Sequence, residues 1–126
     1  MDIEIGKVLE KTKTVRPEDS AMHYGSGMVD VFATPAMVAF MEGCSMELIL
    51  KQLPEGFNTV GTEVSIKHLK ATPVGMEVRC RAEIIEADGR AVLLKVEAFD
   101  EDGKIGEGTH RRFIIDVERF MNKLGS

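Results

Sequence analysis

One segment constrains the fold more than any other: a single long helical pattern that runs from about residue 34 to residue 53. Thr34 is a suitable N-cap and Pro35 a favoured first helical residue. The sequence Pro-Glu-Gly at 54–56 ends the pattern, because proline and glycine break helices. Apolar side chains point in almost every direction around this helix. A helix this apolar must be surrounded by other parts of the chain.

Strand patterns dominate the rest of the chain. The sequence MEVRCRAEIIEA at 76–87 alternates strictly between apolar and polar residues, as in a half-buried antiparallel strand. Asp-Gly at 88–89 predicts a hairpin turn after it. Four other segments are predicted as strands: 7–15, NTVGTEVSIKHL at 58–69, RAVLLKVEAF at 90–99 and KIGEGTHRRFIID at 104–116. The terminal VERFMNKL at 117–124 reads either as a short closing helix or as an extended tail.

One long helix followed by four or more antiparallel strands, in a chain of 126 residues, predicts an α+β protein with the hotdog fold. In this fold an antiparallel β-sheet wraps around one long central helix. We expect residues 1–126 to form a single domain, because a chain of this length can bury one sizeable core.

Composition and charge exclude several classes of function. The chain has a net charge of -5 and no basic block, which argues against nucleic-acid binding. Its apolar runs fall short of the roughly 18 residues that a membrane span needs, and its start, MDIEIGKVLEK, resembles no targeting peptide. We therefore expect a cytoplasmic protein. Cys44 and Cys80 lie far apart, outside any metal-binding motif, so neither a disulfide framework nor a zinc site is indicated. We predict no metal and no cofactor.

Glu42 is the unusual residue of the helix. On a helical wheel it points between Val38, Met46 and Ile49, so it should be largely desolvated. Burying a carboxylate is costly unless it is paired or hydrogen-bonded, which makes Glu42 a candidate base or nucleophile. The alternatives are that the helix rolls enough to expose Glu42, or that Glu42 pairs with an arginine at a subunit contact.

His68 is the second candidate. The alternation in 58–69 places it at the end of an apolar row formed by Val60, Thr62, Val64 and Ile66. A single inward histidine is more often a satisfied core residue than a catalyst. Together with Glu42 and Thr34, however, His68 could complete a site with a nucleophile or base, a proton carrier and a hydroxyl. Thr34 has a strong structural reading as a helix cap, and His23 and His110 are interpreted as structural.

The glycines and arginines of the strands leave alternatives open. Gly61, Gly106 and Gly108 either mark bulges or let a ligand approach the backbone. Arg111 and Arg112 alternate across their strand, so one should face outward. The other could contact a phosphate or a buried carboxylate.

Three segments resemble the fluoroacetyl-CoA thioesterase-like family of hotdog proteins. They are VFATPAMVAFMEGC at 31–44, GTEVSIKHLKATPVG at 61–75 and GEGTHRRFII at 106–115, in the family's order and spacing. The resemblance runs from about Val31 to Lys123. It implies that Thr34, Glu42 and His68 are catalytic and that Gly61 and Arg112 help to shape the site.

The resemblance further implies hydrolysis of an acyl-CoA thioester by a homodimer with composite sites, with coenzyme A as part of the substrate. The segment AMHYGSGMVDVF at 21–32 keeps Phe32 as a substrate-binding residue. It carries Met22, Tyr24 and Met28 instead of the phenylalanines that line the acyl pocket of the fluoroacetate-specific member. We therefore predict a small acyl-CoA substrate without specifying fluoroacetyl-CoA.

Three other functions are compatible with these residues. A non-catalytic dimer could bind acyl-CoA or a small acid in the same pocket. A hotdog hydratase would act on enoyl-CoA, although it usually needs an Asp/His pair in a longer segment. A purely structural dimer would pair Glu42 across its interface. Within the thioesterase hypothesis, Glu42 is either the nucleophile or the general base.

Overall fold

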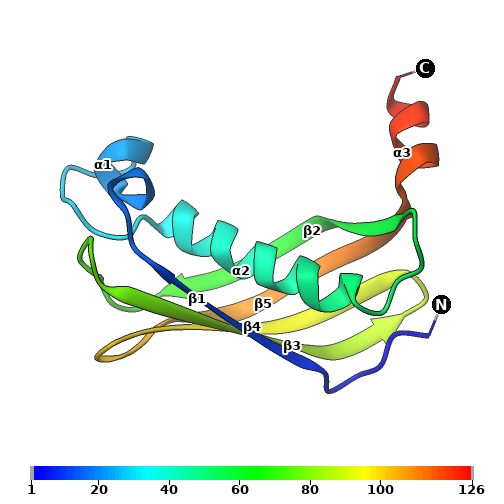
Figure 1. Ribbon diagram of the computed structural model, residues 1–126, viewed down its shortest axis with the longest axis horizontal. Helices are drawn as coiled ribbons and strands as arrows, with labels where there is room; N and C mark the ends of the chain where they lie inside the picture. The colour runs from blue at the N-terminus through cyan, green and yellow to red at the C-terminus, as the bar shows by residue number, and fades with distance from the viewer. Residues whose placement is uncertain (1, 126) are drawn as a thin grey trace.

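The computed structural model of the protein describes residues 2–125. These residues fold into five strands, three α-helices and one short 3-10 helix (Figure 1). In chain order these are β1 (Val8–Thr14), η1 (Pro17–Asp19), α1 (Ala21–Tyr24), α2 (Thr34–Leu50), β2 (Phe57–His68), β3 (Glu77–Asp88), β4 (Ala91–Asp100), β5 (Gly103–Asp116) and α3 (Val117–Leu124).

The five strands form one antiparallel sheet in the order β1-β3-β4-β5-β2. Helix α2 lies along one face of this sheet (Figure 1). The predicted α+β architecture, an antiparallel sheet wrapped around one long helix, is confirmed. Strands β1 and β2 are the two edges, and β2 is the edge that carries His68.

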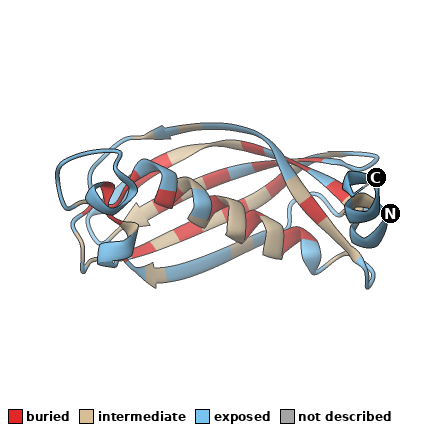
Figure 2. Ribbon diagram, turned by 90° about the horizontal axis from the view of Figure 1, so that it is seen from above, coloured by how far each residue is buried: buried red, intermediate tan, exposed pale blue. Residues whose placement is uncertain are grey.

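The core lies between α2 and the sheet (Figure 2). Met37, Met41 and Cys44 of α2 are fully buried. The sheet contributes alternating residues from its central strands: Val78, Cys80, Ala82, Ile84, Val92, Leu94, Val96 and Ala98. The strict alternation predicted for these strands is therefore the alternation between the helix face and the outer face of the sheet.

The start of α2 differs from the prediction in a way that matters for function. The N-cap residue is Ala33, not Thr34, and no side chain caps the helix. Thr34 is already the first helical residue, and Pro35 occupies the first turn, where its missing N–H costs nothing. The Thr34 hydroxyl is therefore free to bond elsewhere. The helix ends at Leu50, before a turn that carries the chain to residue 53.

Strand β2 contains a β-bulge that the alternation could not show. Gly61 pairs with Arg112 and Glu63 with Arg111, so Thr62 is an extra residue in β2. The Thr62 hydroxyl donates to the Arg111 carbonyl at 3.3 Å. The bulge reverses the alternation, so Gly61 faces α2 although it was placed opposite His68 in the predicted pattern. The prediction that Val60 shares a face with His68 is wrong for this reason.

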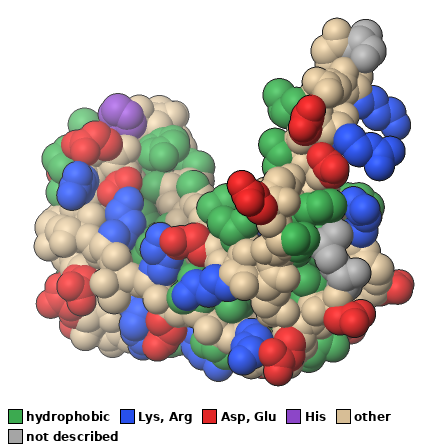
Figure 3. Space-filling model, turned by 45° about the vertical axis from the view of Figure 1, so that its right-hand side comes forward, with side chains coloured by type: hydrophobic (Ala, Val, Ile, Leu, Met, Phe, Trp, Pro, Cys, Tyr) green, Lys and Arg blue, Asp and Glu red, His purple; other side chains and the backbone are tan. Residues whose placement is uncertain are grey.

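The terminal segment is a helix, α3, rather than an extended tail. It stands away from the sheet, with hydrophobic and basic side chains on different sides (Figure 3). Asp116 caps its start by accepting a hydrogen bond from the Arg119 amide at 3.2 Å. Between residues 2 and 125, no helix is both long and apolar enough to cross a membrane.

Candidate active site

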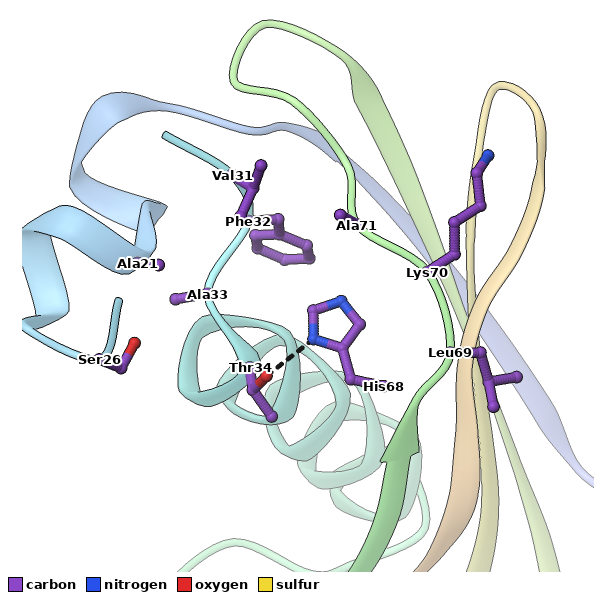
Figure 4. Close-up of a pocket in the computed structure, with 10 residues that line it drawn as sticks. All are labelled: Ala21, Ser26, Val31, Phe32, Ala33, Thr34, His68, Leu69, Lys70 and Ala71. Carbon is purple, nitrogen blue, oxygen red and sulfur yellow. Dashed lines mark hydrogen bonds between the residues drawn. The ribbon is translucent and has the colours of Figure 1, made fainter. Parts of the chain in front are cut away.

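A cavity of about 480 Å³ opens at the start of α2 (Figure 4). Phe32, Thr34 and His68 are among the residues that line it, together with Lys70 and Ala71 from the segment that follows β2. Phe32 is 1% exposed, and its amide donates to the Thr72 carbonyl at 2.8 Å. The predicted substrate-binding Phe32 therefore forms a rigid wall of the same cavity that Thr34 and His68 reach.

Thr34 and His68 are in direct contact. A hydrogen bond of 2.8 Å joins Thr34 Oγ1 and His68 Nδ1, from the first residue of α2 to the last residue of β2 (Figure 4). The contact is possible because no capping bond occupies the Thr34 hydroxyl. We call these two residues the Thr34–His68 pair.

The other ring nitrogen of His68 points into the cavity. Nε2 is buried and has no hydrogen-bond partner among the described residues, and Figure 4 shows it directed toward the space between Phe32 and Ala71. Burial lowers the pKa of His68, although the nearby backbone of Lys70 partly opposes the shift. The imidazole is therefore neutral near pH 7 and can exchange a proton with a molecule in the cavity.

Glu42 lies elsewhere along α2, and its surroundings differ from the prediction. Its side chain is 39% exposed, so it is not largely desolvated in the single chain. Its Oε2 lies 3.8 Å from Arg112 NH1 and 4.0 Å from His110 Nε2. We call Glu42, Gly61, His110 and Arg112 the Glu42 cluster.

Arg112 is the buried member of the Arg-Arg pair, as the alternation required. Its side chain is 8% exposed, whereas Arg111 faces outward and pairs with Glu63 at 3.2 Å. Arg112 Nε donates to Thr59 Oγ1 at 2.7 Å, and NH2 donates to the Thr59 carbonyl at 2.8 Å. Burial lowers the pKa of Arg112, and the Glu42 carboxylate opposes this shift.

His110 is the functional candidate that the sequence interpretation missed. It is completely buried, and its Nε2 contacts Arg112 NH1 at 3.1 Å. The sequence indicates no partner for it, and it is therefore interpreted as structural from the sequence alone. The signal that could have found it is its spacing from Arg112, because residues i and i+2 of a strand share a face.

The three strand glycines have different roles. At Gly61 an added Cβ would lie 3.0 Å from Glu42 Oε2 and 3.1 Å from His110 Cε1, so the missing side chain makes room for the acid. At Gly108 it would lie 2.0 Å from the Ser65 carbonyl oxygen, so this glycine allows β2 and β5 to approach. At Gly106 the side chain of Met37 fills the space. Only Gly61 belongs to the Glu42 cluster.

The Thr34–His68 pair and the Glu42 cluster lie along one seam between α2 and β2. Thr34 and Glu42 are eight residues apart, about 12 Å along the helix axis. Within one chain the structure therefore brings Thr34 and His68 together and leaves Glu42 beside Gly61 and Arg112. Thr34 and His68 line the same cavity, and Glu42 is not among the residues that line it.

Metal chemistry has no obvious site in the part of the chain that the structure describes. No group of three or more histidine, cysteine, aspartate or glutamate residues between 2 and 125 could hold a metal ion. Cys44 and Cys80 are both buried and unbridged. The side chains of the seam that can do chemistry are therefore a hydroxyl, two imidazoles, a carboxylate and a guanidinium.

Comparison with known proteins shows which family the chain resembles. The family model of fluoroacetyl-CoA-specific thioesterases matches residues 15–118. The fluoroacetyl-CoA thioesterase of Streptantibioticus cattleyicolor is 37% identical over 95 residues, which cover 75% of this chain and 68% of the relative. A variant of fluoroacetyl-CoA thioesterase solved with acetyl-CoA superposes with a TM-score of 0.92 at 30% identity, over 97% of this chain and 96% of that one.

A hot-dog-like protein from Thermanaerovibrio acidaminovorans has a TM-score of 0.87 at 22% identity, over 95% of this chain and 89% of that chain. Its identity is low enough that it supports the fold alone. Fold and relatives together define a hotdog protein of the thioester hydrolase class. More particularly, the chain belongs to the family of fluoroacetyl-CoA-specific thioesterases.

Proposed function

We propose that this protein hydrolyses a small acyl-CoA thioester, with Thr34, Glu42 and His68 as its catalytic residues. The observation that carries the proposal is the seam itself: α2 presents both Thr34 and Glu42 toward β2, where His68 and Gly61 face them. The relative solved with acetyl-CoA supports a substrate of this class. Coenzyme A enters as part of the substrate.

The chemistry can follow two routes that use the same residues. As a general base, Glu42 takes a proton from water while the water oxygen forms a bond to the thioester carbon. As a nucleophile, Glu42 forms an anhydride with the acyl group, which water then hydrolyses. In both routes the C–S bond breaks, the acid is released, and the departing thiolate of coenzyme A receives a proton. His68, neutral and open on its Nε2 side, carries protons between these groups.

The start of α2 can stabilise the negative charge that develops on the carbonyl oxygen. The first-turn N–H groups of a helix lack intrahelical partners and carry a partial positive charge. No side chain caps this helix, so its first turn is available to a substrate. Thr34, bonded to His68 at 2.8 Å, orients the imidazole beside that oxyanion position.

Two further residues, Arg112 and Gly61, surround the Glu42 carboxylate. Phe32 lines the cavity that would hold the substrate. The Arg112 guanidinium faces the Glu42 carboxylate at 3.8 Å and can orient it toward the substrate. Gly61 leaves space for Glu42 and for a substrate along the seam. Phe32 walls the cavity for the acyl group. Met22 and Met28 of the segment 21–32 are exposed and are not among the residues that line this cavity.

A second copy of the chain can complete the site, as a homodimer with composite sites would. The seam ends at β2, which is an edge strand whose residues from Gly61 to Ser65 are exposed. Val64, on the helix side of this edge, is 44% exposed. A copy packed along this edge would cover Val64 and enclose the half-exposed Glu42, which converts the open seam into a closed pocket.

The proposal is tested by measuring free thiol released from a panel of acyl-CoA esters. Glu42→Gln keeps the size of the side chain and removes its charge, and we expect thiol release to fall at least about tenfold, since loss of a general base typically costs about 10²–10⁴-fold. Glu47→Gln is the matched control on the same helix, because Glu47 pairs with the exposed Lys11 of β1, away from β2. Equal rates for both variants would remove Glu42 from the site.

A second function, binding of acyl-CoA or a small acid without catalysis, is favoured by one observation. Glu42 and the Thr34–His68 pair do not touch in the single chain. Calorimetry on the wild-type protein separates the two functions. Heat of binding for a CoA ester with no thiol release would support the binding module, whereas thiol release in excess of protein concentration excludes it.

A further inference from the structure

His110 is the most completely enclosed ionisable group of the Glu42 cluster, and both of its ring nitrogens have partners. Nδ1 lies 2.8 Å from the Glu63 carbonyl oxygen on β2. Nε2 lies 3.1 Å from Arg112 NH1 on the same strand, β5. The side chain is completely buried. Such a residue is fixed in one orientation rather than free to rotate.

The partners determine the proton position on this ring. A backbone carbonyl only accepts hydrogen bonds, and a guanidinium only donates them. His110 must therefore carry its proton on Nδ1, which donates to Glu63, and must offer the lone pair of Nε2 to Arg112. A charged imidazole would place an N–H opposite the N–H of Arg112. The neutral ring is thus the only form that satisfies both contacts.

Arg112 depends on this acceptor. Thr59 receives hydrogen bonds from Nε and NH2, which fixes two sides of the guanidinium. NH1, the nitrogen that lies 3.8 Å from Glu42, has His110 as its only hydrogen-bond partner among residues 2–125. Because Glu42 does not hydrogen-bond to Arg112 at this distance, the acid does not itself hold NH1 in place.

We infer that His110 is a positioning residue: its neutral ring accepts a hydrogen bond from Arg112 and thereby holds NH1 opposite the Glu42 carboxylate. This inference rests on the proposed catalytic role of Glu42. Gly61 is part of the same device, since a side chain there would lie 3.1 Å from His110 Cε1 and 3.0 Å from Glu42 Oε2.

The arrangement has a consequence for pH. The groups that face His110 are Arg112 from β5, Glu42 from α2 and the Glu63 carbonyl from β2, while β4 places the apolar Leu94 opposite it. Burial lowers the pKa of His110, and the charge of Arg112 adds to this, while the Glu63 carbonyl and Glu42 oppose it. On acidification the new Nε2 proton faces Glu42 at 4.0 Å, so the carboxylate is drawn to His110 and away from Arg112.

The first experiment reads the proton position directly in the wild-type protein. Two-bond nitrogen–proton NMR correlations distinguish the two neutral tautomers from the charged ring. We expect His110 to be neutral with its proton on Nδ1 at pH 7. A proton on Nε2, or a charged ring at that pH, would overturn the inference. This readout does not depend on catalysis, so it stands apart from the test of Glu42.

The second experiment measures kinetics of His110→Ala and His110→Gln. Loss of the acceptor should lower kcat about tenfold, within the effect of misplacing a reacting group by a fraction of an ångström, with KM changed less than kcat. Glutamine can offer its side-chain oxygen to Arg112, so His110→Gln should recover part of kcat and lose the decline at acidic pH that His110 contributes. Arg111→Gln, on the outer face of the same strand, is the control.

The possible results distinguish a failure of the positioning role of His110 from a failure of the proposed function. Folded variants with wild-type kcat and an unchanged pH profile would show that His110 only stabilises the sheet. If His110→Ala does not fold, the kinetics of His110→Gln and the NMR measurement on the wild-type protein test the positioning role of His110 instead. If Glu42→Gln keeps full activity, the proposed function fails, while an Nδ1 proton on His110 would still confirm the contact with Arg112.

Discussion

The two ends of the α2–β2 seam are built on different physical principles. The Thr34–His68 pair lies at an accessible cavity and is joined by one hydrogen bond of 2.8 Å, whereas the Glu42 cluster places a buried guanidinium and a buried imidazole beneath a half-exposed acid. The first end can adjust to a substrate. The second end is held by four polar contacts to Thr59, Glu63 and within the cluster. The charged end of the seam, the Glu42 cluster, is therefore the more rigid of the two ends.

The largest expected effect on stability comes from the charged end. Arg112→Gln removes the guanidinium and leaves Thr59 and His110 without their donor. We expect the free energy of unfolding to fall by about 3 kcal/mol, the low end for a broken buried ion pair because Glu42 is partly exposed. Urea denaturation at fixed protein concentration measures it. Arg111→Gln should change stability by less than about 0.5 kcal/mol; equal losses in the two variants would contradict the comparison.

Gly61→Ala tests how tightly the Glu42 cluster is packed. The added Cβ would lie 3.0 Å from Glu42 Oε2, so the acid or His110 must shift. Overpacking of this kind costs about 1–3 kcal/mol, and thiol release should fall with it. Gly43→Ala is the matched control, because a Cβ there meets nothing within 4 Å and should favour the helix. A fully active and stable Gly61→Ala would show that the space is not used.

A pH series compares the histidines of the two ends. The pKa of His68 and that of His110 are both lowered by burial. Below about pH 6.5 the unfolded chain therefore binds protons before the folded chain does, and stability falls as pH falls, by at most about 1.4 kcal/mol per pH unit for each histidine. In the His68→Asn variant, the free energy of unfolding should decrease less steeply as pH falls. An unchanged slope in that variant would mean that His68 titrates as in the unfolded chain.

The smallest stability effect is expected at the open end. Thr34→Val removes the hydroxyl that meets His68, and because the contact is exposed we expect a loss of at most about 1 kcal/mol. The effect on kcat/KM should be larger than on unfolding, since His68 loses its orientation. Thr34→Ser keeps the hydroxyl and serves as the control. Equal activity of the valine and serine variants would assign Thr34 no catalytic role.

The same contrast explains what the sequence could predict. Periodicity identified α2, the strands and the fold, because burial on one face leaves a regular pattern in strands such as β3. It placed His68 on the helix face, and it required one of Arg111 and Arg112 to face outward without selecting which. It misplaced Gly61 because the bulge at Thr62 inserts one residue and reverses the alternation, and no local pattern marks that insertion.

The missed features at the site are tertiary contacts. Thr34 was expected to cap α2, but the chain enters the helix one residue earlier and leaves its hydroxyl for His68. His110 acquires its partners from Glu63 on a strand 47 residues away in sequence and from the conformation of Arg112. Glu42 is half exposed because β2 is an edge of the sheet, and edge position depends on strand order.

A double-mutant cycle tests most directly whether both ends of the seam act on one substrate. The kcat/KM for thiol release is measured for Glu42→Gln, His68→Ala and the double variant, each checked for folding. If the acid and the imidazole serve one reaction, the double variant should be about as slow as the slower single variant, because residues that act as a unit are not additive. A shared catalytic site would be contradicted if the loss of kcat/KM in the double variant equals the product of the two single losses. It would also be contradicted if either single variant keeps its kcat/KM.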